Sequence, residues 1–332
     1  MSFKDVIDQK EVVNILKEEL KDERINHAYL FYGKEGIGKK TLAVEFARAL
    51  LCKEAENDSC NICNNCRRVE HGNHPDLKII KENEKTKNLK IDQIREMQKE
   101  IAYKPYESKN KIYIIDGAEN MTNQAANSLL KTLEDPPSYA IIILISEELN
   151  KLLPTVISRC QNLRFSNISR EKMEQFLDKK SMRKEKKELI IGLAKGSIGK
   201  AEELCKNNEF LNKRKKIYNF LKEINNVTKV DIFSEVNDWI NLIKEDFPLF
   251  DLLSAWYRDI IIYKRGNINQ LVNFDYKESI IKEADKYSLN ELLSIIELIE
   301  AHEGYIEKNA FKDLTLQVLL LKIKEKRLQV RV

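Results

Sequence analysis

The chain has 332 residues, enough for about two or three domains. Its 10 glycines and 6 prolines are few for this length, which excludes collagen, low-complexity disorder and turn-dense β sandwiches or barrels. The formal net charge of +4 at pH 7 permits contacts with phosphate groups but does not by itself indicate a nucleic-acid-binding protein.

Neither a membrane-spanning segment nor a secretory signal is recognisable. The longest purely apolar run, Ala140–Ile145, is far shorter than the ~20 residues that a spanning helix needs. Residues Met1–Asp5 lack the apolar stretch of a signal peptide. We therefore expect a cytoplasmic protein, in which thiols stay reduced and clustered cysteines favour metal binding over disulfides.

Residues 1–166 are predicted to form an α/β domain. Short apolar runs with the composition of buried parallel strands occur at Ala28–Tyr32, Leu77–Ile80, Lys111–Ile115 and Ala140–Ile145. Helical patterns lie between these runs, at Lys40–Leu51, Asp92–Tyr103 and Gln124–Leu133. This alternation of strands and helices predicts a doubly wound sheet.

The first strand leads into a glycine-rich loop, Gly33–Lys39, that has most of a Walker A sequence. The glycines Gly33, Gly36 and Gly38 allow backbone N–H groups to approach and cradle phosphates, and Lys39 reaches the phosphate oxygens. A strand before the loop and a helix after it are the context that this motif requires. The segment therefore predicts a phosphate-loop fold, with a tight glycine turn that binds no ligand as the alternative.

The residue after the loop lysine departs from this motif. A Ser or Thr normally stands there as a Mg²⁺ ligand, but this chain has Lys40. Thr41 follows one residue late, which places it ~100° further round the helix. Binding of ATP or ADP at this loop thus remains open, whereas Mg²⁺ coordination and ATP hydrolysis are not expected.

A cluster of cysteines follows the predicted phosphate-loop helix. Cys60, Cys63 and Cys66 form a C-x2-C-x2-C pattern, and Cys52 lies eight positions before it. Four thiolates at short spacing predict a structural Zn²⁺ site without an open position for catalysis. Free thiols or an iron–sulfur centre are the alternatives.

A second motif of nucleotide-binding proteins ends the third predicted strand. Bulky apolar residues lead to Asp116, the pattern of a Walker B strand whose acid holds Mg²⁺. ATPases of this type usually place a glutamate next, to polarise water. Here Gly117 follows, and Glu119 comes two residues later. A simple cap at the end of the strand is the alternative role for Asp116.

The strand patterns cease after residue 166. Residues 167–207 predict a small helical domain whose helices are interrupted at Gly192, Gly196 and Gly199. Residues 208–332 show apolar residues at spacings of three and four and predict a larger helical bundle.

These motifs and their order resemble the clamp-loader branch of the AAA+ family. The most specific matches are Ala125–Pro137, with the sequence AANSLLKTLEDPP, and the triplet Ser158-Arg159-Cys160. Further matching segments are His27–Phe31, Gly33–Lys39, the four cysteines, His74–Asp76, Asp116–Glu119 and Trp256–Asp259.

The resemblance implies a three-part architecture. It comprises an AAA+ P-loop domain over residues 1–166 with a zinc module at about 52–66, a helical lid over 167–207, and a helical collar for oligomerisation over 208–332. It also implies that Arg159 acts in trans, as an arginine finger on ATP bound by the adjacent subunit. The alternative for Arg159 is an arginine at a helix end in a local salt bridge.

The departures from the family pattern point to a subunit without ATPase activity. Hydrolysing members carry Ser or Thr after the loop lysine, Glu after the Walker B acid and Arg in the sensor-2 helix. This chain has Lys40, Gly117 and Gly199 at those positions, with Lys200 one residue from the last. The resemblance therefore implies a scaffold subunit that retains Arg159 to act on a neighbouring subunit but lacks the residues needed to hydrolyse ATP itself.

By resemblance, the expected partners are the ATP-hydrolysing subunits tau/gamma and the delta subunit, together with the sliding clamp and primer-template DNA through the assembly. Two alternatives remain open. One is an active ATPase subunit of the same assembly, which conflicts with Lys40 and Gly117. The other is a zinc-containing DNA-binding protein, which conflicts with the weak net charge and the small, closed cysteine module.

Overall fold

A computed structural model describes residues 3, 6–55, 58–83, 88–180, 182–206, 209–224, 226–245 and 247–328. The chain divides into two compact units, Met1–Phe176 with Gly196–Lys200, and Leu177–Lys195 with Ala201–Val332. The three-domain division remains a prediction, and its expected boundary between 207 and 208 lies outside the described residues. No helix within the described ranges combines the length and apolar character needed to cross a bilayer.

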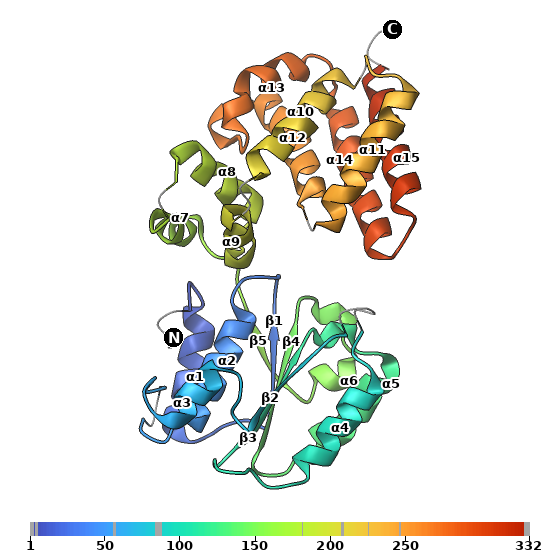
Figure 1. Ribbon diagram of the computed structural model, residues 1–332. Coiled ribbons are helices and arrows are strands. Elements are labelled where there is room, and N and C mark those ends of the chain that lie inside the picture. The colour runs from blue at the N-terminus through green and yellow to red at the C-terminus, as the bar shows by residue number, and fades with distance from the viewer. Residues whose placement is uncertain are drawn as a thin grey trace. The chain divides into compact units, whose positions relative to one another are not determined.

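The first unit is built on a parallel sheet of five strands in the order β2-β3-β4-β1-β5 (Figure 1). All four strand pairings are parallel. The strands are β1 (Ala28–Tyr32), β2 (Leu77–Lys81), β3 (Lys111–Asp116), β4 (Ala140–Ser146) and β5 (Gln161–Arg164). The predicted α/β fold is therefore confirmed, and its four expected strands are present.

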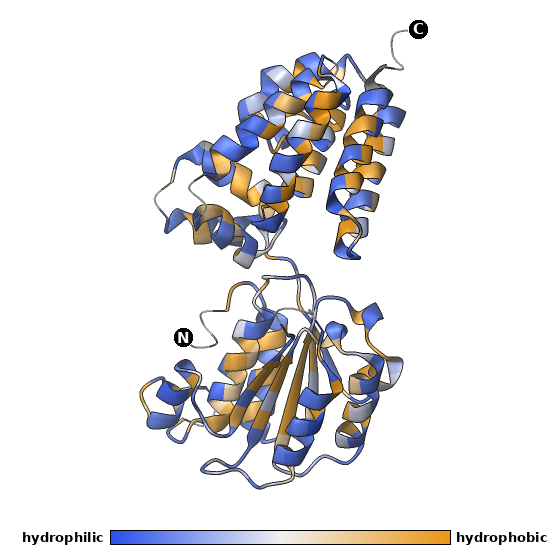
Figure 2. Ribbon diagram, turned by 45° about the vertical axis from the view of Figure 1, so that its right-hand side comes forward, coloured by the Kyte–Doolittle hydropathy of each residue, from blue (hydrophilic) through white to orange (hydrophobic). Residues whose placement is uncertain are grey.

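Helices cover both faces of this sheet, and each face has its own apolar core. One core joins alternate strand residues such as Phe31 and Ile143 to the first helices of the chain. The other joins the intervening residues, such as Leu30 and Leu144, to later helices. Figure 2 shows the strands as hydrophobic ribbons between helices with hydrophilic outer faces. The helices are α1 (Lys10–Asp22), α2 (Lys39–Leu51) and α3 (Asn64–Glu70) on the first face, and α4 (Ile91–Ile101), α5 (Asn123–Glu134) and α6 (Pro154–Ile157) on the second.

Strand β5 was not among the expected strands. Its sequence Gln161-Asn162-Leu163-Arg164 contains one buried residue, Leu163, because β5 lies at the sheet edge and pairs only with β1. A strand of this kind has no continuous apolar run to reveal it.

The glycines expected to interrupt the small helical region behave differently from the prediction. Gly196 does break the chain, with φ at +84° between α8 (Lys184–Ala194) and α9 (Ile198–Lys206). Gly192 and Gly199 lie inside these two helices, so the prediction is wrong for them. A Cβ atom at Gly192 would come within 2.5 Å of the Val272 side chain. Close packing, rather than a turn, requires this glycine.

The described part of the second unit is helical. Its apolar stripe Leu252, Leu253, Trp256 and Ile260 is buried within the unit, with no side chain more than 1% exposed. The remaining helices are α7 (Arg170–Asp178), which begins in the first unit, α10 (Phe210–Glu223), α11 (Lys229–Lys244), α12 (Leu249–Lys264), α13 (Lys277–Ala284), α14 (Leu289–Glu307) and α15 (Lys312–Leu328).

A buried polar network fixes the segment between α12 and α13. The Asp259 carboxylate accepts hydrogen bonds from the backbone N–H groups of Val272 (3.0 Å) and Asn273 (2.7 Å), and from the Asn273 side-chain amide (2.8 Å). The Asn273 amide oxygen accepts in turn from Arg214, whose guanidinium also binds Asp275 through two bonds of 2.6 and 2.7 Å. Asp259 and Asn273 are fully buried, so each lost partner leaves a polar group without water.

We predict that Asp259→Ala lowers the free energy of unfolding of the helical unit by roughly 3 kcal/mol, because three donors, two of them buried, lose their acceptor. Both tryptophans, Trp239 and Trp256, are buried in this unit, so their fluorescence during urea denaturation reports on it selectively. The exposed Asp238→Ala on α11 is the matched control and should change stability little. Equal midpoints for the two variants would contradict the assigned role of Asp259.

Candidate functional site

Parallel pairing brings the carboxyl ends of β1, β3 and β4 to one edge of the sheet. The phosphate loop follows β1, Gly117 follows β3, and Glu147 follows β4. Ligand sites of parallel sheets lie at this edge. The predicted Walker A and Walker B segments therefore meet there, although they are separated by about eighty residues in the sequence.

The loop has the backbone conformation that its glycines permit. Gly33, Gly36 and Gly38 have φ values of +145°, +69° and +98°. The Gly33 N–H donates to the Ser146 carbonyl (3.2 Å), which fastens the start of the loop to the end of β4. A Cβ atom at Gly33 would lie 2.7 Å from the Phe165 carbonyl oxygen, so only glycine fits there.

Lys39, at the start of α2, is turned back onto the loop. Its side-chain ammonium donates to the carbonyl oxygens of Gly33 and Lys34, and the residue is only 6% exposed. Burial lowers the pKa of Lys39, and nearby carboxylates, with Glu147 the strongest and Glu119 next, oppose that shift. Carbonyl and carboxylate oxygens of its own chain thus compensate part of the cost of burying this charge.

Lys40 forms an ion pair with the Walker B acid. Its Nζ atom lies 2.8 Å from Asp116 Oδ2, and the two side chains are 43% and 27% exposed. Thr41, the next residue, is exposed. A lysine ammonium therefore contacts the carboxylate that holds Mg²⁺ in hydrolysing relatives. The binding roles of the loop glycines, Lys39, Lys40, Thr41 and Asp116 remain predictions.

Acidic side chains approach the same place from two further segments. The Glu119 carboxylate accepts a hydrogen bond from the Glu147 backbone N–H (3.1 Å). Desolvation, followed by the nearby Glu35 carboxylate, raises the pKa of Glu147. Together with Asp116, these three carboxylates all interact electrostatically with Lys39. Four carboxylates therefore lie close enough to the phosphate loop to interact with Lys39.

Arg159 lies just after the short helix α6, opposite the end of α5. Its guanidinium donates to Glu134 Oε1 (2.6 Å) and to the Thr155 carbonyl (2.9 Å), and its side chain is 34% exposed. This is the local salt bridge that the sequence left open as an alternative. Arg159 is partly exposed and Glu134 more so, and ion pairs of this kind contribute little to stability, so breaking this one to reach another partner would cost little.

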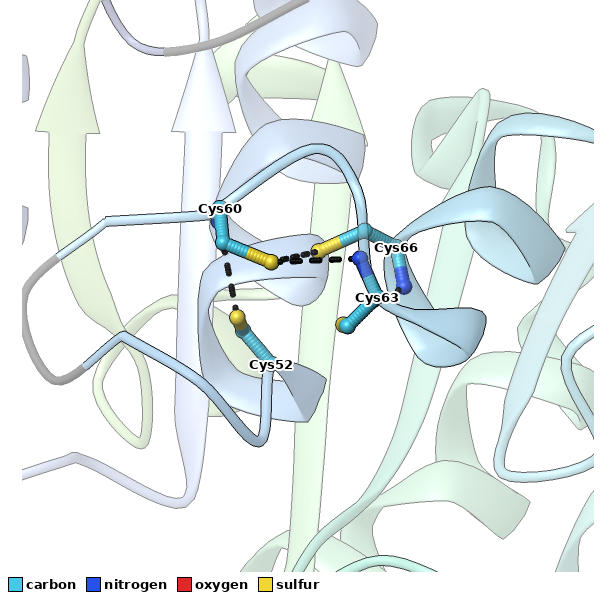
Figure 3. A group of neighbouring side chains, drawn as sticks. All are labelled: Cys52, Cys60, Cys63 and Cys66. Carbon is cyan, nitrogen blue, oxygen red and sulfur yellow. Dashed lines mark hydrogen bonds between the residues drawn. The ribbon is translucent and has the colours of Figure 1, made fainter.

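The four cysteines form one cluster. Cys52 comes at the end of α2, Cys60 and Cys63 lie in the following loop, and Cys66 is in the first turn of α3. Their Sγ atoms all lie within 4.8 Å of one another, and Figure 3 shows the side chains turned toward a common centre. Such a set of four thiols could hold a metal ion.

Backbone N–H groups in the segment Cys60–Cys66, here called the knuckle, donate hydrogen bonds to the cysteine sulfur atoms. The Cys63 N–H donates to Cys60 Sγ (3.3 Å), the Cys66 N–H donates to Cys63 Sγ (3.4 Å), and the Cys60 N–H donates to Cys52 Sγ (3.5 Å). The N–H groups of Cys63 and Ile62 lower the pKa of the Cys60 thiol to about 6. This shift favours the thiolate of Cys60, the form that binds metal, whereas burial raises the pKa of the Cys66 thiol.

Side chains outside the cysteine motif attach the cluster to the first unit. On α2, the buried Arg48 donates to Asn61 Oδ1 (2.9 Å) in the loop between Cys60 and Cys63. The Asn65 side-chain amide donates to the Leu51 carbonyl at the end of the same helix (2.8 Å). These polar contacts hold the knuckle against the phosphate-loop helix.

The sequence did not single out two functional neighbours. Glu134, the partner of Arg159, lies 25 residues before it, and Glu147 is brought to the phosphate loop only by the strand order. Glu147 follows directly on a predicted strand that ends at the ligand-binding edge of the sheet. That position was available as a signal for Glu147, whereas nothing in the sequence pairs Glu134 with Arg159.

Comparison with protein families gives two matches that together span most of the chain. A family model described as DNA polymerase III, delta subunit, matches residues 8–169. A second, described as DNA polymerase III, delta subunit, C terminal, matches residues 208–325.

Among individual proteins, DNA polymerase III subunit delta' of Bacillus subtilis is 34% identical over 297 residues, which cover 87% of this chain and 89% of that protein. DNA polymerase III subunit tau of Bacillus subtilis is 29% identical over 79% of this chain but only 50% of its own length. The tau/gamma subunit of Haemophilus influenzae is 36% identical over 53% of this chain and 25% of its own length. The similarity to delta' thus extends over nearly the whole of both chains.

Proposed function

The chain belongs to the DNA polymerase III delta' family, and it is a subunit of the clamp loader. From this premise we propose that it supports ATP-dependent loading of the sliding clamp onto primed DNA without hydrolysing ATP itself. Its role is to provide a scaffold and to present Arg159 to the nucleotide of a neighbouring subunit.

The observation that carries the non-hydrolysing role is the Lys40–Asp116 ion pair at 2.8 Å. The Walker B carboxylate is engaged by a cation of its own chain, and the hydroxyl that would complete a Mg²⁺ site is replaced by an ammonium. Gly117 follows Asp116, so the position after this acid offers no carboxylate to orient water. Both changes remove groups that act in hydrolysis.

Arg159 is the group proposed to act on the neighbour. It follows α6 in the Ser-Arg-Cys triplet, and its guanidinium is partly exposed. An arginine in this place can stabilise the charge that develops on a transferring phosphoryl group. When the guanidinium moves from Glu134 to a phosphate, one anionic partner replaces another. The arginine charge therefore keeps a partner throughout.

The cysteine cluster is proposed to bind one structural Zn²⁺. Four thiols with knuckle N–H···S bonds match the donor set of closed zinc sites, which hold four sulfur ligands at ~2.3 Å from the metal. Bound zinc would fix the loop Cys52–Cys66 against α2 and α3 and leave no ligand position for substrate. Its contribution is therefore to folding.

The proposed partners follow from the family. They are the tau/gamma ATPase subunits and the delta subunit, with the sliding clamp and primer-template DNA contacted through the assembly. Residues 208–332 are proposed as the collar through which the subunits associate. As a replication subunit the chain would work in the cytoplasm.

We predict that the isolated protein has negligible steady-state ATPase activity. A sensitive phosphate-release assay should give the same background rate for the wild type and for Lys39→Ala, because no working Mg²⁺ site exists to be lost. Turnover comparable to that of an active AAA+ subunit, abolished by Lys39→Ala, would contradict the proposal and would favour an active ATPase subunit of the same assembly.

We predict that Arg159→Ala leaves this subunit folded and able to join the complex but slows hydrolysis of the adjacent ATP by roughly 10³-fold or more. The measurement is single-turnover ATP hydrolysis and clamp loading by the reconstituted complex. Glu134→Ala is the decisive control, because it breaks the same local ion pair and keeps the arginine.

Comparison of Arg159→Ala with Glu134→Ala distinguishes an arginine finger from an arginine that only forms a structural salt bridge. If Arg159 acts on the neighbouring nucleotide, Glu134→Ala retains most of the activity that Arg159→Ala loses. If the two variants are equally impaired, or if both are as active as the wild type, Arg159 is not a finger. An exposed arginine on α4, Arg95→Ala, controls for the general loss of a surface charge.

For the cysteine cluster we predict about one Zn²⁺ per chain, and loss of that metal in Cys63→Ser. Removal of zinc by a chelator should accelerate amide hydrogen exchange in residues 52–70, because structural zinc supplies folding free energy directly. Cys205→Ser, a cysteine of the helical unit outside the cluster, is the matched control and should retain the metal. A metal-free wild-type protein with full protection of this segment would refute the zinc site.

A further inference from the structure

A short stretch of chain returns to the phosphate loop after leaving the first unit. The chain departs from this unit at Phe176 and comes back for only five residues, Gly196–Lys200. The Ile168 N–H donates to the Gly196 carbonyl (2.9 Å), and the Gly199 N–H donates to the Gly36 carbonyl (2.9 Å). The second bond links the returning segment directly to the phosphate loop.

The contact between the loop and the segment is a backbone-to-backbone contact. A Cβ atom at Gly199 would lie 2.9 Å from Gly36 Cα, and a Cβ atom at Gly36 would lie 2.3 Å from Ser197 Oγ and 3.1 Å from Gly199 Cα. Neither glycine can carry a side chain while this packing is kept. The family resemblance places Gly199 where hydrolysing members have the sensor-2 arginine, and an arginine at Gly199 would exclude this contact.

The charged groups of the loop are likewise satisfied from within the chain. Lys39 donates to two carbonyl oxygens of its own loop and lies near the carboxylates of Glu147 and Glu119. Lys40 neutralises Asp116. The Mg²⁺ of an arriving Mg²⁺–nucleotide would have to displace Lys40 from Asp116, and its phosphates would meet the carboxylates of Glu147 and Glu119.

The residues present therefore do not fit a Mg²⁺–nucleotide complex. We infer that the phosphate loop of this protein is a ligand-independent latch, in which the Lys40–Asp116 pair takes the place of the metal and the Gly36–Gly199 contact holds Gly196–Lys200 against the sheet edge. This inference rests on the non-hydrolysing role proposed above and states what the site does instead. The glycine-rich conformation of the loop is then required by the Gly36–Gly199 contact and not by a ligand.

Two helical glycines give a matched test of the latch. Gly199 and Gly304 both lie inside α-helices, but nothing lies within 4 Å of a Cβ atom built at Gly304. Alanine favours a helix over glycine, so Gly304→Ala should raise the melting temperature by about 2–4 °C. Gly199→Ala lies in the first turn of α9, so it gains at most this propensity and must also move the phosphate loop away from the new methyl group.

We expect Gly199→Ala to lower the melting temperature and to accelerate hydrogen exchange by about tenfold or more in Gly33–Lys39 and in Gly196–Lys200, with Gly304→Ala unchanged there. In the wild type without nucleotide, the Gly199 amide should already be protected, and millimolar Mg²⁺–ATP should leave the exchange of both segments unchanged. The wild-type measurement stands even if Gly199→Ala does not fold.

Two results would overturn the latch. One is a Gly199→Ala variant that is stabilised as Gly304→Ala is, with normal protection of the loop. The other is an unprotected Gly199 amide in the wild type that becomes protected when Mg²⁺–ATP is added. Either result is separate from the ATPase test, because a protein without turnover could still bind nucleotide or lack the latch.

Discussion

The Lys40–Asp116 ion pair is the interaction on which the interpretation of this structure depends. A phosphate loop and a Walker B strand converge at the carboxyl edge of a parallel sheet, and their meeting point normally serves a divalent cation and the phosphates it binds. In this chain a lysine ammonium lies 2.8 Å from the carboxylate instead. The sheet edge keeps the geometry of a metal-binding site, while the positive charge beside Asp116 comes from the Lys40 side chain.

Several other features of the site agree with a lysine in contact with Asp116. If the loop holds no nucleotide, as proposed, the resemblance explains why Gly199 can stand at the sensor-2 position, and the returning segment packs directly on Gly36. Glu147 and Glu119 can face Lys39 without repelling a ligand. Arg159, by contrast, is partly exposed and contacts none of these groups, so the proposed action on a neighbour does not require catalysis by its own subunit.

Much of the fold could be predicted because buried parallel strands are continuous apolar runs and because Pro136 and Pro137 stop α5 sharply. The cysteine cluster was predictable from spacing, since a helix end and a tight knuckle bring the four sulfurs together. Strand β5 was missed because it buries a single residue at a sheet edge. The contacts of Arg159 with Glu134, of Arg48 with Asn61 and of Gly199 with Gly36 depend on tertiary packing, which no local pattern encodes.

If Lys40 occupies the place of the metal, no divalent cation binds with ATP at Asp116. Electron paramagnetic resonance of Mn²⁺ with ATP measures this binding, using protein whose cysteine site is filled with zinc. We expect no protein-bound Mn²⁺–ATP on the wild-type chain at concentrations that saturate an active AAA+ subunit. One Mn²⁺–ATP bound per wild-type chain, released on Asp116→Asn, would show that Asp116 still holds a metal and that Lys40 does not replace it.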